Sequence, residues 1–529
     1  MGQHGFWDAA GEAERNFQWR ARAMAAAYCV LVLATLCAGW IVHRWAGNTL
    51  PLPWDDEVVF FWPAVHWMQD GSLLAPELNP ERDLMWMPPG MMVVLGTLFK
   101  ILPIRLEVAR WVSWGMLATG YLCCMLWFRR MKRRLLCGTL LSGFFLNGAF
   151  TAVGNVARMD AWIWGMGAAA FMLLHSGDEG WRRQTGWIML GVMPLVHPNG
   201  LYFLTAAGLA EGGCRLAARW SSKVLDHSSP EGQKRRICLW GIPVALLWCA
   251  YGIYVAIHKT DFVSDISWQF AAGMNIFAPK EDGTTWEALL AWPTVGCLSW
   301  YLLFGLHALW KSPRNLWVVG WGGANLMAYV IRHEMWYDIF WQSGWLWLIV
   351  LGFQMDIPLH GRCGRIVRAL AHGVLFAWAG MFFLRHGFIE GPKGYAQELN
   401  WGWGMILEQD TPYLDKGDEM CLKTKLETMA KEAGHPIRVS FKPAGDQLLV
   451  LDCFDKSIKP FYPIFSDETA DFTIVHVSRY RPDWLETESA VPVGAMPFHE
   501  RDGTEQWYCF ATPHAGRTGQ SCNQETTIQ

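Results

Sequence analysis

Three carboxylates, Asp55, Asp56 and Glu57, stand side by side directly after the first long apolar segment of the chain. A positioned carboxylate can accept the proton of an alcohol and make it a nucleophile, and ionisable groups beside the hydrocarbon of a membrane are usually functional. A structural role is also open, because Asp55 or Asp56 could cap a helix over EVVFFWPAVHWMQ or lie in a solvated loop. Repulsion should disfavour ionisation of at least one of the three, and a divalent cation could relieve it.

A second polar group lies in NVARMDAW, where Arg158 and Asp160 precede an apolar run. A guanidinium presents a planar fork of N–H donors that suits a phosphate, so Arg158 could bind the phosphate of a substrate. Asp160 could then orient Arg158 or bind a sugar. The alternative is an interfacial ion pair, or an arginine whose apolar stem lies in the membrane and whose head reaches water.

Two further stretches carry candidate binding residues. In PLVHPNGL, His197 is a candidate substrate-binding or catalytic residue. A turn residue or a headgroup contact is the favoured interpretation, because Pro and Asn-Gly account for the turn by themselves. In RHEMWYD, a helix would place Glu334 and Tyr337 on one face. This stretch is either a girdle of aromatic and charged groups at the membrane interface or a substrate clamp, with Arg332 or His333 near a phosphate.

These residues must be positioned by membrane helices. The chain has 529 residues, of which 52% are hydrophobic and only 17% charged, and its mean hydropathy is +0.13. Ordinary soluble domains carry about 25% charged residues. Together with many long apolar runs, this composition indicates an α-helical polytopic membrane protein. The net charge of -3 does not suggest a nucleic-acid partner.

The distribution of basic residues predicts the topology, because Lys and Arg stay on the cytoplasmic side. Residues 1–22 are expected in the cytoplasm, followed by a retained first helix over AMAAAYCVLVLATLCAGWIV. A transmembrane domain over 23–386 would hold roughly 11 to 13 spans, with a first outer loop at 46–107. The short apolar stretch 90–102 is expected to be interfacial or re-entrant, because a full crossing would place RRMKRR outside.

Residues 387–529 are more polar and predict a small extracytoplasmic α/β domain, on the periplasmic or extracellular side of the membrane. QLLVLDCF and DFTIVHV are typical of strands, and KTKLETMAKEA is typical of a helix. An even set of cysteines favours disulfides in an oxidising compartment, whereas free thiols would fit a cytosolic tail. The set is Cys421, Cys453, Cys509 and Cys522.

The order of these features resembles a known family. A D-E-x-x-F stretch at Asp56–Phe60 is followed by MPPGMMVVLGTLFKIL and by ARWVSWGMLATGYLCCMLWFRR, a helix that ends in Arg-Arg. This order is similar to that of the GT-C membrane glycosyltransferases. The closest group is the protein O-mannosyltransferase-like one, which includes the lipid A aminoarabinose transferases. The motifs cover roughly residues 25–260, and the expected topology extends the resemblance to about 385.

The resemblance implies an enzyme that takes a sugar from a polyprenyl-phosphate donor at the outer face of a cytoplasmic membrane. It implies that Asp56 is the base on the acceptor, with Asp55 as the alternative and Glu57 as a substrate-binding neighbour. A single displacement with a phosphate leaving group needs one carboxylate rather than the acid–base pair of a glycosidase. The metal requirement stays open, and so does the acceptor group, which is a hydroxyl or a phosphate of a lipid, a glycan or a protein.

Two other classes of function are compatible with a polytopic chain. A transporter or lipid flippase would place charged pairs or broken helices near the bilayer midplane, often with an inverted repeat, and neither is evident in the sequence. An inactive relative that scaffolds envelope assembly is the third possibility. The intact acidic loop favours the enzyme.

Overall fold

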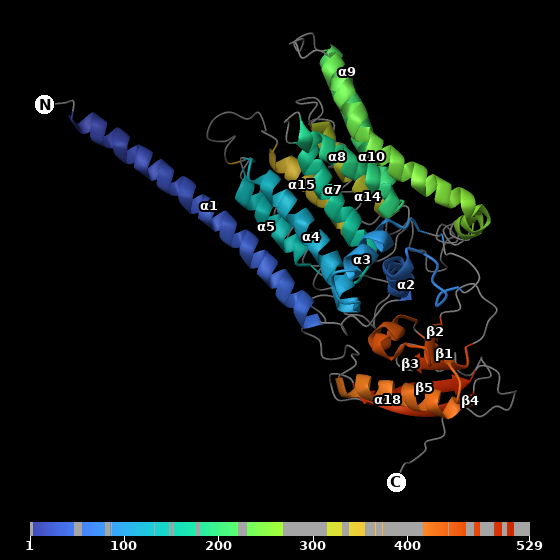
Figure 1. Cartoon of the computed structure of the whole chain (residues 1–529). Coiled ribbons are helices and arrows are strands. Elements are labelled where there is room, and N and C mark those ends of the chain that lie inside the picture. Colours follow the sequence, from blue (N-terminus) through green and yellow to red (C-terminus); the bar gives the residue numbers. More distant parts are fainter. Residues whose placement is uncertain are drawn as a thin grey trace, which may run out of the picture.

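The computed structural model describes residues 4–46, 55–79, 85, 87–131, 133–147, 150, 153–175, 180–220, 230–267, 315–330, 338–354, 366, 373, 416–442, 444–461, 470–476, 491–499 and 505–512. In this part of the chain a bundle of apolar helices adjoins a smaller domain that contains a sheet, as Figure 1 shows. The described helices of the bundle fall within residues 4–354, and the described elements of the smaller domain fall within 416–512.

The helical bundle is built from long apolar segments of the first 354 residues. The strongest packing joins α4 to α7, α7 to α8, α9 to α14, α14 to α15, and α2 to α3. The helices are α1 (His4–Ala46), α2 (Asp55–Asp70), α3 (Gly90–Phe99), α4 (Leu106–Phe128), α5 (Arg134–Phe145), α7 (Met159–His175), α8 (Trp181–Val196), α9 (Gly200–Trp220), α10 (Pro230–Ile257), α14 (Asn315–Val330) and α15 (Asp338–Gln354).

Among the described residues, two helical segments are long and apolar enough to cross a membrane, Ala21–His43 and Leu106–Phe128. A third is possible if Gly241–Ile257 and Lys259–Ser267, which meet at 91°, form one broken span. Much of the predicted set of spans falls on residues outside the description. Helix α3 has ten residues and a length of about 15 Å, too short to cross. This length agrees with the expected interfacial or re-entrant role of 90–102.

The C-terminal domain has a five-stranded sheet in the order β2-β1-β3-β5-β4. Strand β1 runs parallel to β2 and β3, whereas β5 runs antiparallel to β3 and β4. The elements are α18 (Lys416–Ala433), β1 (Ile437–Lys442), the 3-10 helix η3 (Ala444–Cys453), β2 (Ile458–Phe461), β3 (Phe472–His476), β4 (Val491–His499) and β5 (Glu505–Thr512).

One predicted strand is wrong. QLLVLDCF lies largely in η3 rather than in the sheet. Consecutive residues from Ala444 to Val450 are buried, so the segment has none of the alternation that identifies a half-buried strand. A short apolar run buried on all sides cannot be assigned by periodicity alone. The predicted strand in DFTIVHV and the predicted helix in KTKLETMAKEA are confirmed as β3 and α18.

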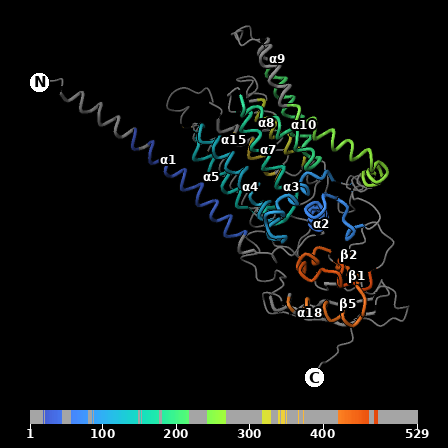
Figure 2. Tube along the Cα trace, viewed as in Figure 1, coloured from blue at the N-terminus to red at the C-terminus, as the bar shows by residue number. Residues whose placement is uncertain are grey.

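The C-terminal domain packs on the bundle through α2. The indole Nε1–H of Trp62 donates to Oε1 of Gln447 at 3.0 Å, and the ring of Trp62 meets Phe454 edge-on at 6.2 Å. Ala444 and Leu448 belong to the same buried core as the bundle residues. Figure 2 shows α2 between the other helices and the C-terminal domain, so α2 is held from both sides.

Candidate active site

In the first turn of α2, the side chains of Asp56 and Glu57 point in different directions. Successive residues of an α-helix point about 100° apart, so Asp56 and Glu57 face different surroundings. The side chain of Asp56 is 33% exposed, whereas Glu57 is fully buried. The side chain of Asp55 lies outside the description. Of these two side chains, only that of Asp56 therefore reaches the surface.

Glu57 is paired with an arginine of α4. Nε and Nη2 of Arg110 donate to Oε1 and Oε2 of Glu57 at 2.9 and 2.7 Å, a bidentate contact between two buried side chains. The backbone N–H of Ala157 also donates to Oε1 of Glu57, at 2.7 Å. This carboxylate was predicted to bind substrate. The role stays a prediction that this conformation does not support, because Glu57 has no exposed surface and its oxygens accept hydrogen bonds from Arg110 and Ala157.

Arg158 forms ion pairs with two carboxylates, those of Asp56 and Asp160. Its guanidinium contacts the Asp56 carboxylate through Nη1, and its Nε donates to Oδ2 of Asp160 at 3.1 Å. Arg158 and Asp160 are 7% and 2% exposed. Oδ1 of Asp160 is buried and accepts no hydrogen bond from the described residues. The structure thus brings three predicted residues, Asp56, Arg158 and Asp160, into one cluster.

The cluster is assembled at one end of the bundle. Glu57 lies in the first turn of α2, Arg110 lies near the start of α4, and Asp160 lies at the start of α7. His43 near the end of α1 contacts the segment that precedes Arg158, because its Nδ1 lies 2.6 Å from Oδ1 of Asn155. The basic residues that follow α4 begin at Arg129, about 28 Å along the helix from Arg110. The acidic cluster and this basic stretch therefore lie at opposite ends of α4.

The remaining predicted residues stand apart or cannot be placed. His197 is 4% exposed and ends α8, and its Nδ1 accepts the backbone N–H of Asn199 at 3.0 Å. These contacts favour the turn role over a catalytic one. The predicted clamp lies outside the described residues. It comprises Arg332, His333, Glu334 and Tyr337.

Arg110 is the residue of the cluster that the sequence analysis missed. A signal was present, because an arginine in the apolar segment EVARWVSW is costly to bury and calls for a partner. The partner lies 53 residues away, so the sequence did not identify it.

The charges of the cluster bear on the metal requirement, which the sequence left open. Arg110 and Arg158 supply positive charge to the carboxylates of Glu57, Asp56 and Asp160. Across the described ranges, no group of three or more His, Cys, Asp or Glu side chains could hold a metal ion. In this conformation arginines relieve the repulsion that the sequence predicted.

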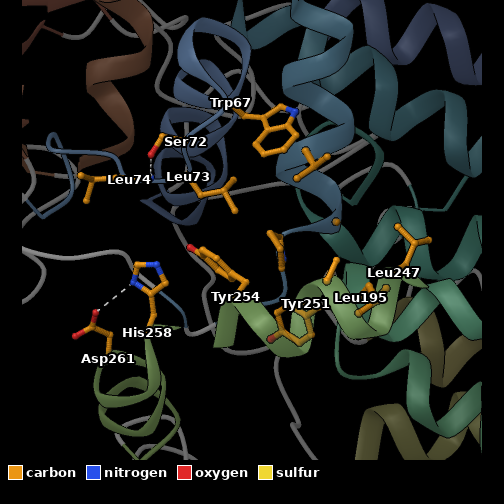
Figure 3. A pocket seen from close by; sticks show the side chains of 15 residues that line it. Trp67, Ser72, Leu73, Leu74, Leu195, Leu247, Tyr251, Tyr254, His258 and Asp261 are labelled. Carbon is orange, nitrogen blue, oxygen red and sulfur yellow. Dashed lines mark hydrogen bonds and ion pairs between the residues drawn. The ribbon is translucent and has the colours of Figure 1, made fainter. Parts of the chain in front are cut away.

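A separate cavity lies at the other end of α2. It has a volume of about 690 Å³, and Trp67, Tyr251, Tyr254 and Leu195 contribute to its mostly apolar wall (Figure 3). His258 and Asp261 lie at its polar edge, with Nδ1 and Oδ2 3.9 Å apart. Trp67 is about 16 Å along α2 from Asp56, so the cavity does not contain the acidic cluster.

Comparisons with known proteins find similar solved structures at low sequence identity. No family model matches the chain, and no curated protein matches its sequence. The solved structures to which the chain is similar include an ArnT and an oligosaccharyltransferase.

The first of these structures is ArnT from Cupriavidus metallidurans in the apo state, with 13% identity, a TM-score of 0.47, and coverage of 94% of this chain and 100% of that one. The second is the same protein bound to undecaprenyl phosphate, with 13% identity, a TM-score of 0.47, and coverage of 93% and 99%. The third is the Archaeoglobus fulgidus oligosaccharyltransferase in complex with Zn and sulfate, with 11% identity, a TM-score of 0.43, and coverage of 90% and 72%. Because these TM-scores are below 0.5, we base the function on the side chains of the cluster.

Proposed function

We propose that the chain is a GT-C-type glycosyltransferase. It moves a sugar from a polyprenyl-phosphate donor to a hydroxyl of an acceptor at the outer face of the membrane. The observation that carries the proposal is the partly exposed carboxylate of Asp56, which matches the D-E-x-x-F motif and lies in contact with the buried Arg158. The ion pairs lie at helix ends rather than at mid-helix, which favours a transferase over a transporter.

In the proposed reaction Asp56 is the base. Its carboxylate accepts the proton of the acceptor hydroxyl as the hydroxyl oxygen bonds to the anomeric carbon. The bond from that carbon to the phosphate oxygen breaks, and polyprenyl phosphate leaves as an anion that needs no proton. One displacement of this kind inverts the configuration of the anomeric carbon.

Arg158 acts on the leaving group in this scheme. Negative charge grows on the phosphate oxygen as the glycosidic bond breaks, and a fixed guanidinium stabilises that charge. Asp160 holds the Nε side of Arg158, so the planar group keeps one orientation. The buried position of both side chains keeps water away and strengthens the interaction.

Replacing Asp56 by Asn tests the proposal. The amide has almost the same shape but cannot accept the proton, so turnover should fall by about 10²- to 10⁴-fold. Turnover is measured as release of polyprenyl phosphate from polyprenyl-phosphate sugars extracted from host membranes. Asp70→Asn at the exposed far end of α2 is the matched control and should keep normal turnover. An active Asp56→Asn enzyme would reject Asp56 as the base.

The sugar and the acceptor follow from a second experiment. Deleting the gene from its host should cause one polyprenyl-phosphate sugar to accumulate and one glycan or glycolipid modification to disappear. Profiling both pools identifies donor and acceptor together. Unchanged pools would contradict a transferase role.

A further inference from the structure

Glu57 and Arg110 form a fully buried ion pair next to the proposed base Asp56. The two side chains are 0% and 1% exposed. Taking a carboxylate and a guanidinium out of water costs several kcal/mol each, and a buried pair often contributes less stability than apolar residues of similar size. A pair kept in such a place calls for a role other than stability.

The hydrogen bond between Glu57 and Ala157 joins the immediate sequence neighbours of Asp56 and Arg158. Glu57 follows Asp56 in α2, and Ala157 precedes Arg158. The Ala157 N–H to Glu57 bond, at 2.7 Å, therefore runs beside the contact between Arg158 and Asp56. These two links join the start of α2 to the segment before α7.

Arg110 supplies the charge that lets Glu57 serve as this link. A carboxylate buried without its cation would take a proton or turn toward water, and either change would release the N–H of Ala157. The bidentate contact fixes both carboxylate oxygens, so Glu57 presents Oε1 to Ala157 in one orientation.

We propose that Arg110 is a positioning residue of the transferase. Acting through Glu57 and the backbone of Ala157, it sets the distance between Arg158 and Asp56. This inference rests on the proposed function, and it assigns to Glu57 a position in the support of the site rather than in contact with substrate.

The test compares purified full-length variants, with turnover normalised to folded protein. Arg110→Gln leaves Glu57 without its cation, and kcat should fall about 100-fold, since a shift of about 1 Å costs that much. Glu57→Gln added to Arg110→Gln removes the stranded charge and keeps an amide oxygen for Ala157, so it should restore kcat about tenfold. The double variant contains no unpaired charge, so it tests the proposal even if the single variant does not fold.

Two measurements separate positioning from a merely structural role. Adding Arg110→Gln to Arg158→Ala should lower kcat less than about threefold further, because groups that act through one unit give non-additive losses. Arg183→Gln is the control: it breaks the partly buried ion pair with Glu211, and should leave kcat within about threefold.

The proposal is overturned if folded Arg110→Gln enzyme keeps normal kcat, if adding Glu57→Gln to it brings no recovery, or if the losses with Arg158→Ala multiply in full. Asp56→Asn distinguishes the two levels. If Asp56→Asn is active, the proposed function is rejected. If Asp56→Asn is inactive but Arg110→Gln is fully active, only the positioning role of Arg110 is rejected.

Discussion

Arg158 contacts two carboxylates of different exposure, and this difference defines what its removal should do. Asp160 is buried, whereas Asp56 is partly open, so an incoming phosphate can approach the guanidinium from the side of Asp56. Arg158→Ala should raise the KM for the donor about tenfold or more and change the KM for the acceptor much less, because only the donor carries the phosphate. Steady-state kinetics with each substrate varied in turn measure both. Equal effects on the two would leave Arg158 a structural ion pair.

His66 provides a pH-dependent contribution to stability in the same helix. Its Nε2 lies 2.8 Å from Oε2 of Glu77, and this hydrogen bond raises the pKa of His66 above its ordinary value of 6.5. A raised folded-state pKa stabilises the protein below the unfolded value, and that stability is lost as pH rises through the folded value. The melting temperature should therefore exceed that of Glu77→Gln most below about pH 6.5, and the difference should shrink at higher pH. A difference that grows with pH would contradict the pairing.

Single residues were predictable from the sequence where their chemistry was local. Asp56, Arg158 and Asp160 were selected because charged groups near apolar segments demand an explanation, and the fold brings them together. The difference in exposure between Asp56 and Glu57 was not predictable. It depends on which way each side chain leaves the helix and on Arg110, a partner from another helix.

At the scale of elements, replacing either of two glycines of α4 by alanine should have different effects on stability. A Cβ at Gly120 would lie 2.6 Å from the Trp164 ring and 2.8 Å from Cα of Gly165, so α4 and α7 approach each other too closely for a side chain. A Cβ at Gly115 would meet nothing within 4 Å. Gly120→Ala should destabilise by about 1–3 kcal/mol, whereas Gly115→Ala should stay within about 1 kcal/mol of the parent.

Thermal unfolding in detergent compares the two variants, and turnover should follow the order of their stabilities, because α4 and α7 carry Arg110 and Asp160. Equal melting temperatures would contradict the close crossing of the two helices.

Elements were predictable from the sequence when their pattern was one-sided or their length decisive. The short α3 and the helix over KTKLETMAKEA follow from length and periodicity. The 3-10 helix η3 could not be predicted from periodicity, because its residues are covered on one side by the sheet domain and on the other by α2. Burial by two neighbours removes the polar face that a sequence pattern needs.

At the scale of the whole molecule, the C-terminal domain supports the helix that bears Asp56. Trp62→Phe keeps a ring in place but removes the N–H that reaches Gln447, leaving a buried amide oxygen without this donor, at a cost of about 1–3 kcal/mol. Trp67→Phe is the matched control in α2, because its indole N–H makes an exposed, longer bond of 3.3 Å to Thr97. Trp62→Phe should lower both melting temperature and turnover more than Trp67→Phe. The reverse order would show that the domain does not brace α2.

The wide separation in sequence of Glu57 and its partners also concerns biogenesis. Glu57 leaves the ribosome 53 residues before Arg110 and 100 residues before Ala157. At about 5–20 residues per second, the nascent chain carries this carboxylate for about 3–10 seconds before its cation is even made. Until then the segment cannot settle beside the hydrocarbon as a charged species. Until Arg110 emerges, Glu57 must therefore be protonated or remain in contact with water, so its burial in the bundle has to follow the synthesis of α4.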